Sequence, residues 1–150
     1  MSGKLNILIM GASYGSLLGA KLVLAGHDIA LVCLPAEAEL INRAGIRVRM
    51  PVKGRAGLVE IDSRCGPGRV AALAPEAADP AGFDLVGLAM QEPQYRSPGV
   101  RQLLDRVARA KKPTMSIMNM PPLPYLARIP GLDTSKLTGC YSPSLINLLR

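Results

Sequence analysis

The residues best suited to chemistry form a short glycine-containing turn near the N-terminus, Gly11-Ala12-Ser13-Tyr14-Gly15-Ser16. Small side chains let backbone N–H groups come close to a phosphate. A helix that starts at such a turn adds electrostatic attraction for the same anion, because its N-terminal end is positive. These six residues are therefore our candidate phosphate-binding residues.

The segments on either side place this turn inside a βαβ unit. Residues 5–10 and 29–34 are apolar and predict buried strands, and residues 15–25 predict a helix that Gly26 ends. A glycine turn after the first strand of such a unit is typical of dinucleotide-binding folds. We therefore expect one domain over residues 1–150, a doubly wound α/β fold of the Rossmann type. Its sheet is expected to be mostly parallel, with helices on both faces.

The turn departs from the full G-x-G-x-x-G fingerprint, so other interpretations stay open. Ser13 stands at the second glycine, and the last glycine comes one residue early, at Gly15. The same residues match the G-x-S-x-G turn of hydrolases, but the only histidine, His27, lies roughly 20 Å away along the predicted helix. The spacing also fits the G-x-G-x-G of methyltransferases that bind S-adenosylmethionine. A tight turn without a ligand is the remaining interpretation.

The end of the second predicted strand leaves the choice of dinucleotide open. NAD-binding folds favour an acidic residue there and NADP-binding folds an arginine, whereas this chain has Cys33-Leu34. Glu37 and Arg43 come nearby, but on the next predicted helix, which begins at Pro35. The expected cofactor is therefore NADP or NAD.

The rest of the chain supplies the other elements of such a fold. Alternating apolar and polar residues at 46–50, and a short strand at 58–62, predict that residues 46–74 form an antiparallel or irregular insert beside the sheet. Residues 75–82 are predicted to be a surface connection. Further elements are predicted at 83–89 (a buried strand), 99–109 (a helix), 114–118 and 138–141 (strands). Gln91 and Asn119 come after two of these strands, at the sheet edge where such folds bind ligands, so Gln91 is a candidate cofactor-binding residue.

Composition and charge narrow the function classes. Hydrophobic residues make up 49% of the chain and charged residues 19%, which indicates a folded domain. The net charge is +7, but aromatic residues are only 3%, so we expect no nucleic-acid partner. Three scattered cysteines and one histidine predict no metal site and a reduced, cytoplasmic protein. No apolar stretch reaches ~20 residues, so we expect no membrane span; a homodimer is compatible with the sequence.

Three segments, residues 15–27, 84–91 and 117–120, share a pattern with one known family. They resemble the stretch after the glycine turn, the strand that ends in Val-Lys and the Gln-Asn-Gly segment of the ketopantoate reductases (2-dehydropantoate 2-reductases). This resemblance implies the N-terminal NAD(P)-binding domain of an oxidoreductase that transfers hydride to the carbonyl of a small-molecule 2-oxo acid. It also makes Asn119 the candidate catalytic residue.

The chain departs from the family at several positions. Gln91 stands where the family has a lysine near the nicotinamide, and Leu34 where an arginine contacts the 2′-phosphate. The family also has a helical second domain that brings a catalytic lysine and glutamate, and Arg150 comes before it. We therefore expect a fragment that binds the cofactor without turning over substrate alone. The alternatives are a non-catalytic nucleotide-binding module and, third, a methyltransferase.

Overall fold

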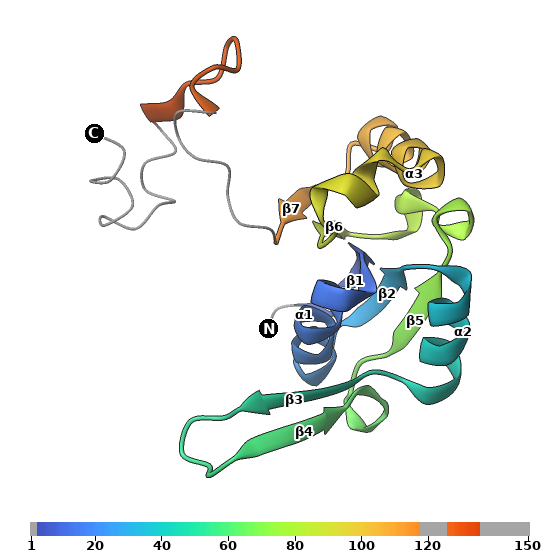
Figure 1. Ribbon diagram of the computed structural model, residues 1–150, viewed down its shortest axis with the longest axis vertical. Coiled ribbons are helices and arrows are strands. Elements are labelled where there is room, and N and C mark those ends of the chain that lie inside the picture. Colours follow the sequence, from blue (N-terminus) through green and yellow to red (C-terminus); the bar gives the residue numbers. More distant parts are fainter. Residues whose placement is uncertain (1–2, 118–125, 136–150) are drawn as a thin grey trace. The chain divides into compact units, whose positions relative to one another are not determined.

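Five parallel strands form the central sheet, as the computed structural model in Figure 1 shows. They are β1 (Asn6–Met10), β2 (Asp28–Val32), β5 (Val70–Leu73), β6 (Leu85–Leu88) and β7 (Thr114–Ser116). Their order across the sheet is β5-β2-β1-β6-β7, so the chain extends the sheet first on one side of β1 and then on the other. The structure describes residues 3–117 and 126–135.

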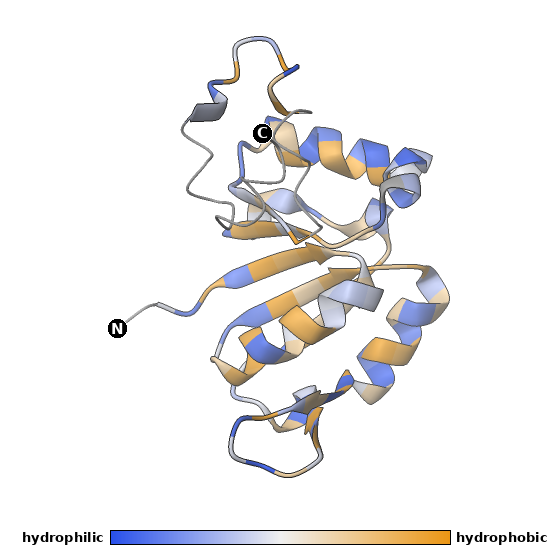
Figure 2. Cartoon of the chain, turned by 60° about the vertical axis from the view of Figure 1, so that its left-hand side comes forward, coloured by the Kyte–Doolittle hydropathy of each residue, from blue (hydrophilic) through white to orange (hydrophobic). Residues whose placement is uncertain are grey.

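Helices cover both faces of this sheet. The α1 (Ala12–Leu24) and α2 (Pro35–Ala44) helices pack on one face, and α3 (Pro98–Arg109) packs on the other. Successive residues of β1 alternate between the two cores, with Ile7 and Ile9 facing α1, and Leu8 and Met10 facing α3. All four are buried, and Figure 2 shows the strands as largely hydrophobic. The predicted doubly wound, Rossmann-type α/β fold is confirmed.

The α1 helix lies close to the sheet because two glycines face it. A Cβ at Gly15 would lie 2.7 Å from Ile9 Cγ2, and one at Gly19 would lie 2.5 Å from Ile29 Cδ1. A larger residue at either position would have to displace these side chains or move the helix away from β1 and β2. The helix begins at Ala12, three residues before the predicted start, so the predicted bounds of 15–25 were wrong at the N-terminal end.

An antiparallel hairpin follows α2 and projects from the body of the domain (Figure 1). It consists of β3 (Arg47–Pro51) and β4 (Leu58–Asp62), which confirms an antiparallel insert over these residues. The predicted extent of the insert, to residue 74, was wrong, because β5 pairs parallel with β2 in the central sheet. Side chains alternate along β3, where Val48 is half-buried against the α1 side of the core and Arg49 is exposed. The Arg49 guanidinium pairs with Glu60 directly across the hairpin, at 2.9 Å.

Short 3-10 helices make the remaining connections. They are Ser63–Cys65, Pro75–Ala77, Pro80–Gly82 and Glu92–Arg96. The predicted surface connection at 75–82 is only partly exposed, because Ala78 and Pro80 are buried beneath α3. In the separate unit of residues 119–150, the described segment 126–135 forms consecutive turns. The predicted strand at 138–141 lies outside the described residues. Within the described ranges, no helix is long and apolar enough to cross a membrane.

Candidate functional site

A cavity of about 290 Å³ opens at the carboxyl ends of the strands, where the strand order reverses beside β1. Residues that follow β1, β2 and β6 line it, together with the first turn of α1 and residues near the start of α3. These lining residues are Gly11, Ala12, Ser13, Val32, Cys33, Leu34, Glu37, Pro75, Ala89, Met90, Gln94, Ser97 and Val100. Ligands of open parallel sheets bind in the crevice at this reversal of strand order. We call this cavity the carboxyl-edge crevice.

Gly11 lines the carboxyl-edge crevice and is the single residue between the end of β1 and the start of α1. Its φ of +106° is a conformation that other residues rarely adopt. A Cβ there would lie 2.7 Å from the carbonyl oxygen of Ala89, which follows β6. Its N–H donates to the carbonyl of Val32 at 2.8 Å. Gly11 thus holds the ends of β1, β2 and β6 close together at the bottom of the crevice.

The first turn of α1 presents its backbone N–H groups to the crevice. Ala12 and Ser13 line the cavity, and the N–H groups at a helix start have no carbonyl partner within the helix. No side chain caps this end of α1, and its first turn holds no acidic residue. The arrangement leaves the positive end of the helix available to an anion.

Three of the six residues predicted to hold a phosphate line the crevice, whereas Tyr14, Gly15 and Ser16 do not. Gly11, Ala12 and Ser13 line the crevice. Gly15 instead faces the sheet, where it permits close packing. The Ser16 hydroxyl donates to the carbonyl of Ala12 at 2.5 Å, so it is engaged within the helix.

Tyr14 and Gln91, both predicted site residues, do not line the crevice, but their side chains meet between α1 and the segment after β6. The Gln91 side-chain amide donates to the Tyr14 hydroxyl at 3.3 Å. The backbone N–H of Gln91 donates to Gln94 Oε1 at 2.8 Å, and the N–H of Met90 donates to the Tyr95 hydroxyl at 3.2 Å. These bonds fix the segment that follows β6. Asn119, the predicted catalytic residue, lies outside the described residues.

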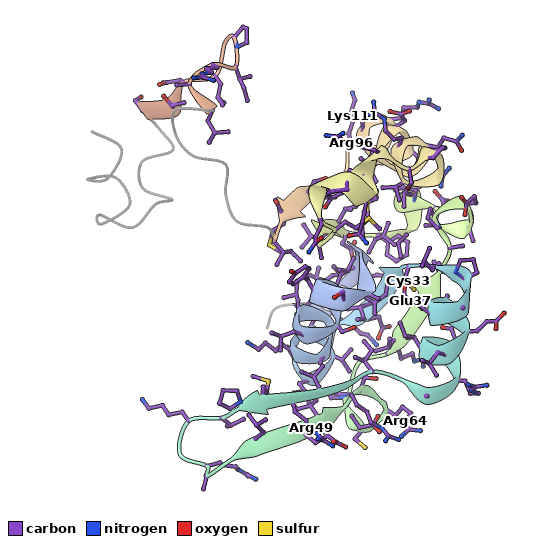
Figure 3. The ribbon with its side chains drawn as sticks, in the orientation of Figure 1. Cys33, Glu37, Arg49, Arg64, Arg96 and Lys111 are labelled. Atoms are coloured by element: carbon purple, nitrogen blue, oxygen red, sulfur yellow. The ribbon has the colours of Figure 1, made fainter. Side chains whose placement is uncertain are left out.

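The sequence placed Glu37 near the end of the second predicted strand without selecting it, and its carboxylate is the one charged group among the described lining residues. Its Oε2 accepts a hydrogen bond from the backbone N–H of Leu34 at 3.2 Å, at the start of α2. Figure 3 shows Glu37 and Cys33 next to each other where β2 passes into α2. The available signal was the helix start at Pro35, which places Glu37 in the first turn and aims it back toward the end of β2.

Cys33 is a structural thiol of the crevice wall. Burial, together with the negative charge of Glu37, raises its pKa to about 11. The thiol is therefore protonated at neutral pH and is a poor nucleophile. Within the described ranges, no three histidine, cysteine or acidic side chains gather into a group that could hold a metal ion.

The position of His27 excludes the hydrolase interpretation of the glycine turn. Its Nδ1 accepts a hydrogen bond from the N–H of Leu5 at 3.2 Å, next to the start of β1. Ser13 lies at the opposite, carboxyl edge of the same strand. The two side chains therefore cannot act as a nucleophile and its base.

A second cavity, of about 370 Å³, lies at the amino end of β5, on the opposite edge of the sheet. Asn42, Ser63, Arg64 and Arg69 provide its polar lining. Asp62 already binds Arg64, which holds the pKa of Asp62 well below its usual range. The negative, C-terminal end of α2 also faces this cavity, so it suits a phosphate less well than the carboxyl-edge crevice.

Comparisons with known proteins support the fold. No protein-family model and no curated protein matches the sequence. The structure is similar to that of a protein from Ralstonia solanacearum MolK2 assigned as a ketopantoate reductase, with a TM-score of 0.53 and 23% identity. That match covers 85% of this chain and 36% of the other. A saccharopine dehydrogenase (L-Glu forming) from Saccharomyces cerevisiae has a TM-score of 0.43 and 16% identity, over 80% of this chain and 23% of the other.

Proposed function

We propose that this chain is the NAD(P)-binding domain of an oxidoreductase and that the dinucleotide binds in the carboxyl-edge crevice. The observation that carries the proposal is the uncapped first turn of α1, which opens into the crevice directly above Gly11. A pyrophosphate needs such a set of N–H groups and no facing acid in the first turn. The sequence resemblance and the similar Ralstonia fold point to the same class of cofactor.

Each part of the crevice has a distinct role in this proposal. The backbone N–H groups of Ala12 and Ser13 bind the pyrophosphate. The end of β2, with Glu37, receives the adenosine ribose, because folds of this type place the ribose there. The segment after β6, including Ala89 and Met90, lies beside the nicotinamide. The cofactor itself supplies the hydride, and this domain binds and orients it.

For the complete reaction we propose reduction of the carbonyl of a 2-oxo acid, as the resemblance to ketopantoate reductases implies. The described lining of the crevice contains neither lysine nor histidine. Hydride addition to a carbonyl needs a proton donor for the alkoxide that forms. In this proposal the donor comes from outside the described lining. The same observation favours a second candidate, a module that binds the dinucleotide without hydride chemistry.

A charge placed at Ser13 tests the binding proposal. Ser13 is exposed at the start of α1, where an acidic residue favours the helix. Ser13→Asp should therefore leave the melting temperature unchanged or raised, yet weaken NADH binding at least about tenfold by repelling the pyrophosphate. Ser13→Ala, which keeps the backbone N–H, is the matched control and should bind within about threefold of wild type.

Calorimetric titration of the full chain with NADH, NADPH and S-adenosylmethionine provides the measurement. Binding of either dinucleotide that Ser13→Asp weakens and Ser13→Ala preserves supports the proposal. Dinucleotide binding that is equal in all three proteins would place the pyrophosphate elsewhere. Binding of S-adenosylmethionine alone would favour the methyltransferase interpretation.

A further inference from the structure

The β2 end of the carboxyl-edge crevice carries one charged side chain among its described lining residues, and that side chain is the acid Glu37. No lysine or arginine belongs to the same lining. We propose that this end of the crevice selects NAD(H) over NADP(H), with Glu37 as the specificity-determining residue. This inference rests on the proposed function, and it goes further by naming the cofactor and the residue that chooses it.

The position of Glu37 suits it to bind a ribose diol. It is the third residue of α2, and its Oε2 accepts from the N–H of Leu34. That bond fixes the carboxylate against the end of β2. Oε1 has no hydrogen-bond partner among the described residues, so it is available to accept from a ribose hydroxyl. A hydrogen bond to an ionised acceptor is stronger than one between neutral groups.

The same position disfavours a 2′-phosphate. The start of α2 is a positive helix end that would otherwise attract such a group, but Glu37 already occupies it. Leu34, at the family's arginine position, is an exposed apolar side chain. Arg43 follows Glu37 by six helical residues, which places it roughly 9 Å further along the axis of α2. A 2′-phosphate would therefore face a carboxylate with no lysine or arginine in the described lining.

The negative charge of Glu37 also affects the pKa of the neighbouring Cys33 thiol. Burial is the larger cause of the raised pKa of Cys33, and the Glu37 carboxylate is the second. Cys33 lines the crevice directly before Leu34. Glu37 and Cys33 thus lie together on the wall of the crevice where the ribose would bind.

A comparison of two neutralised acids on α2 tests the inference. We expect the wild-type chain to bind NADH at least about tenfold more tightly than NADPH. Glu37→Gln keeps the size of the side chain and removes its charge, so it should reduce that ratio to about threefold or less. Glu39→Gln is the matched control, because Glu39 is an exposed acid on the same helix outside the crevice lining, and it should leave the ratio unchanged. Calorimetric titration of all three full-length chains with both dinucleotides measures the ratios.

The possible results separate this inference from the proposed function. NADPH binding that equals or exceeds NADH binding in wild type overturns the inference and leaves the proposed function standing. An unchanged NADH preference in Glu37→Gln overturns the role of Glu37. The absence of binding for both dinucleotides overturns the inference and the proposed function together.

Discussion

At the scale of single residues, two features of the structure each favour glycine at position 11. Its backbone has a φ of +106°, and the carbonyl of Ala89 occupies the space where a side chain would begin. Either feature alone favours glycine. Together they explain why the single residue that turns the chain from β1 into α1 is a glycine.

Gly11→Ala is therefore expected to destabilise the protein strongly. The backbone strain and the contact with Ala89 should lower the free energy of unfolding by about 2–4 kcal/mol. Gly54→Ala is the matched control, because Gly54 also has a positive φ, +82°, but has open space around it. It should cost about 1 kcal/mol from the backbone alone. Urea unfolding of the two variants compares them, and equal losses would show that the contact with Ala89 contributes nothing.

At the scale of elements, a side chain protects β5, one of the two edge strands of the described sheet. The Asn42 amide of α2 donates to the carbonyl of Ala72 at 2.9 Å and accepts from its N–H at 2.8 Å. Ala72 lies in β5, which has a strand neighbour on one side only. The amide thus makes the pair of bonds that a further strand would make and covers part of an exposed edge.

Removing this amide should loosen the β5 edge. Asn42→Ala loses both bonds and should reduce the free energy of unfolding by about 1–3 kcal/mol. Glu39→Ala on the same helix, which removes an exposed side chain, should change it by less than about 0.5 kcal/mol. Hydrogen exchange gives an independent measurement, because the N–H of Ala72 should exchange faster in Asn42→Ala. Unaltered exchange at Ala72 would contradict the role given to Asn42.

At the scale of the whole molecule, much of the fold was predicted, because every apolar run predicted as a strand within the described residues forms one, although β5 was not predicted. Residues 5–10 and 29–34 became β1 and β2 within one or two residues at each end. The start of α1 was missed because Gly11 completes the turn alone, whereas a longer loop was expected. Strand pairing across the sheet also depends on contacts between distant segments, which a local pattern does not contain.

The site was predicted less completely than the fold. Gly11, Ala12 and Ser13 line the crevice, and their binding of a phosphate stays a prediction, but Gly15 serves helix packing, a role that its place in a motif does not reveal. Glu37 was missed because the acid was sought on β2 itself. A side chain in the first turn of the next helix reaches the same place by folding back, and only the structure shows that direction.

The most direct test of the account is to map amide chemical shifts of the full chain as NADH is added. We expect the largest changes at the ends of β1, β2 and β6, including Ala12, Ser13 and Leu34, with little change around Arg64 and Arg69. The opposite pattern, with changes around Arg64 and Arg69 and none at the start of α1, would place the ligand in the cavity at the amino end of β5. That result would contradict the carboxyl-edge crevice as the dinucleotide site.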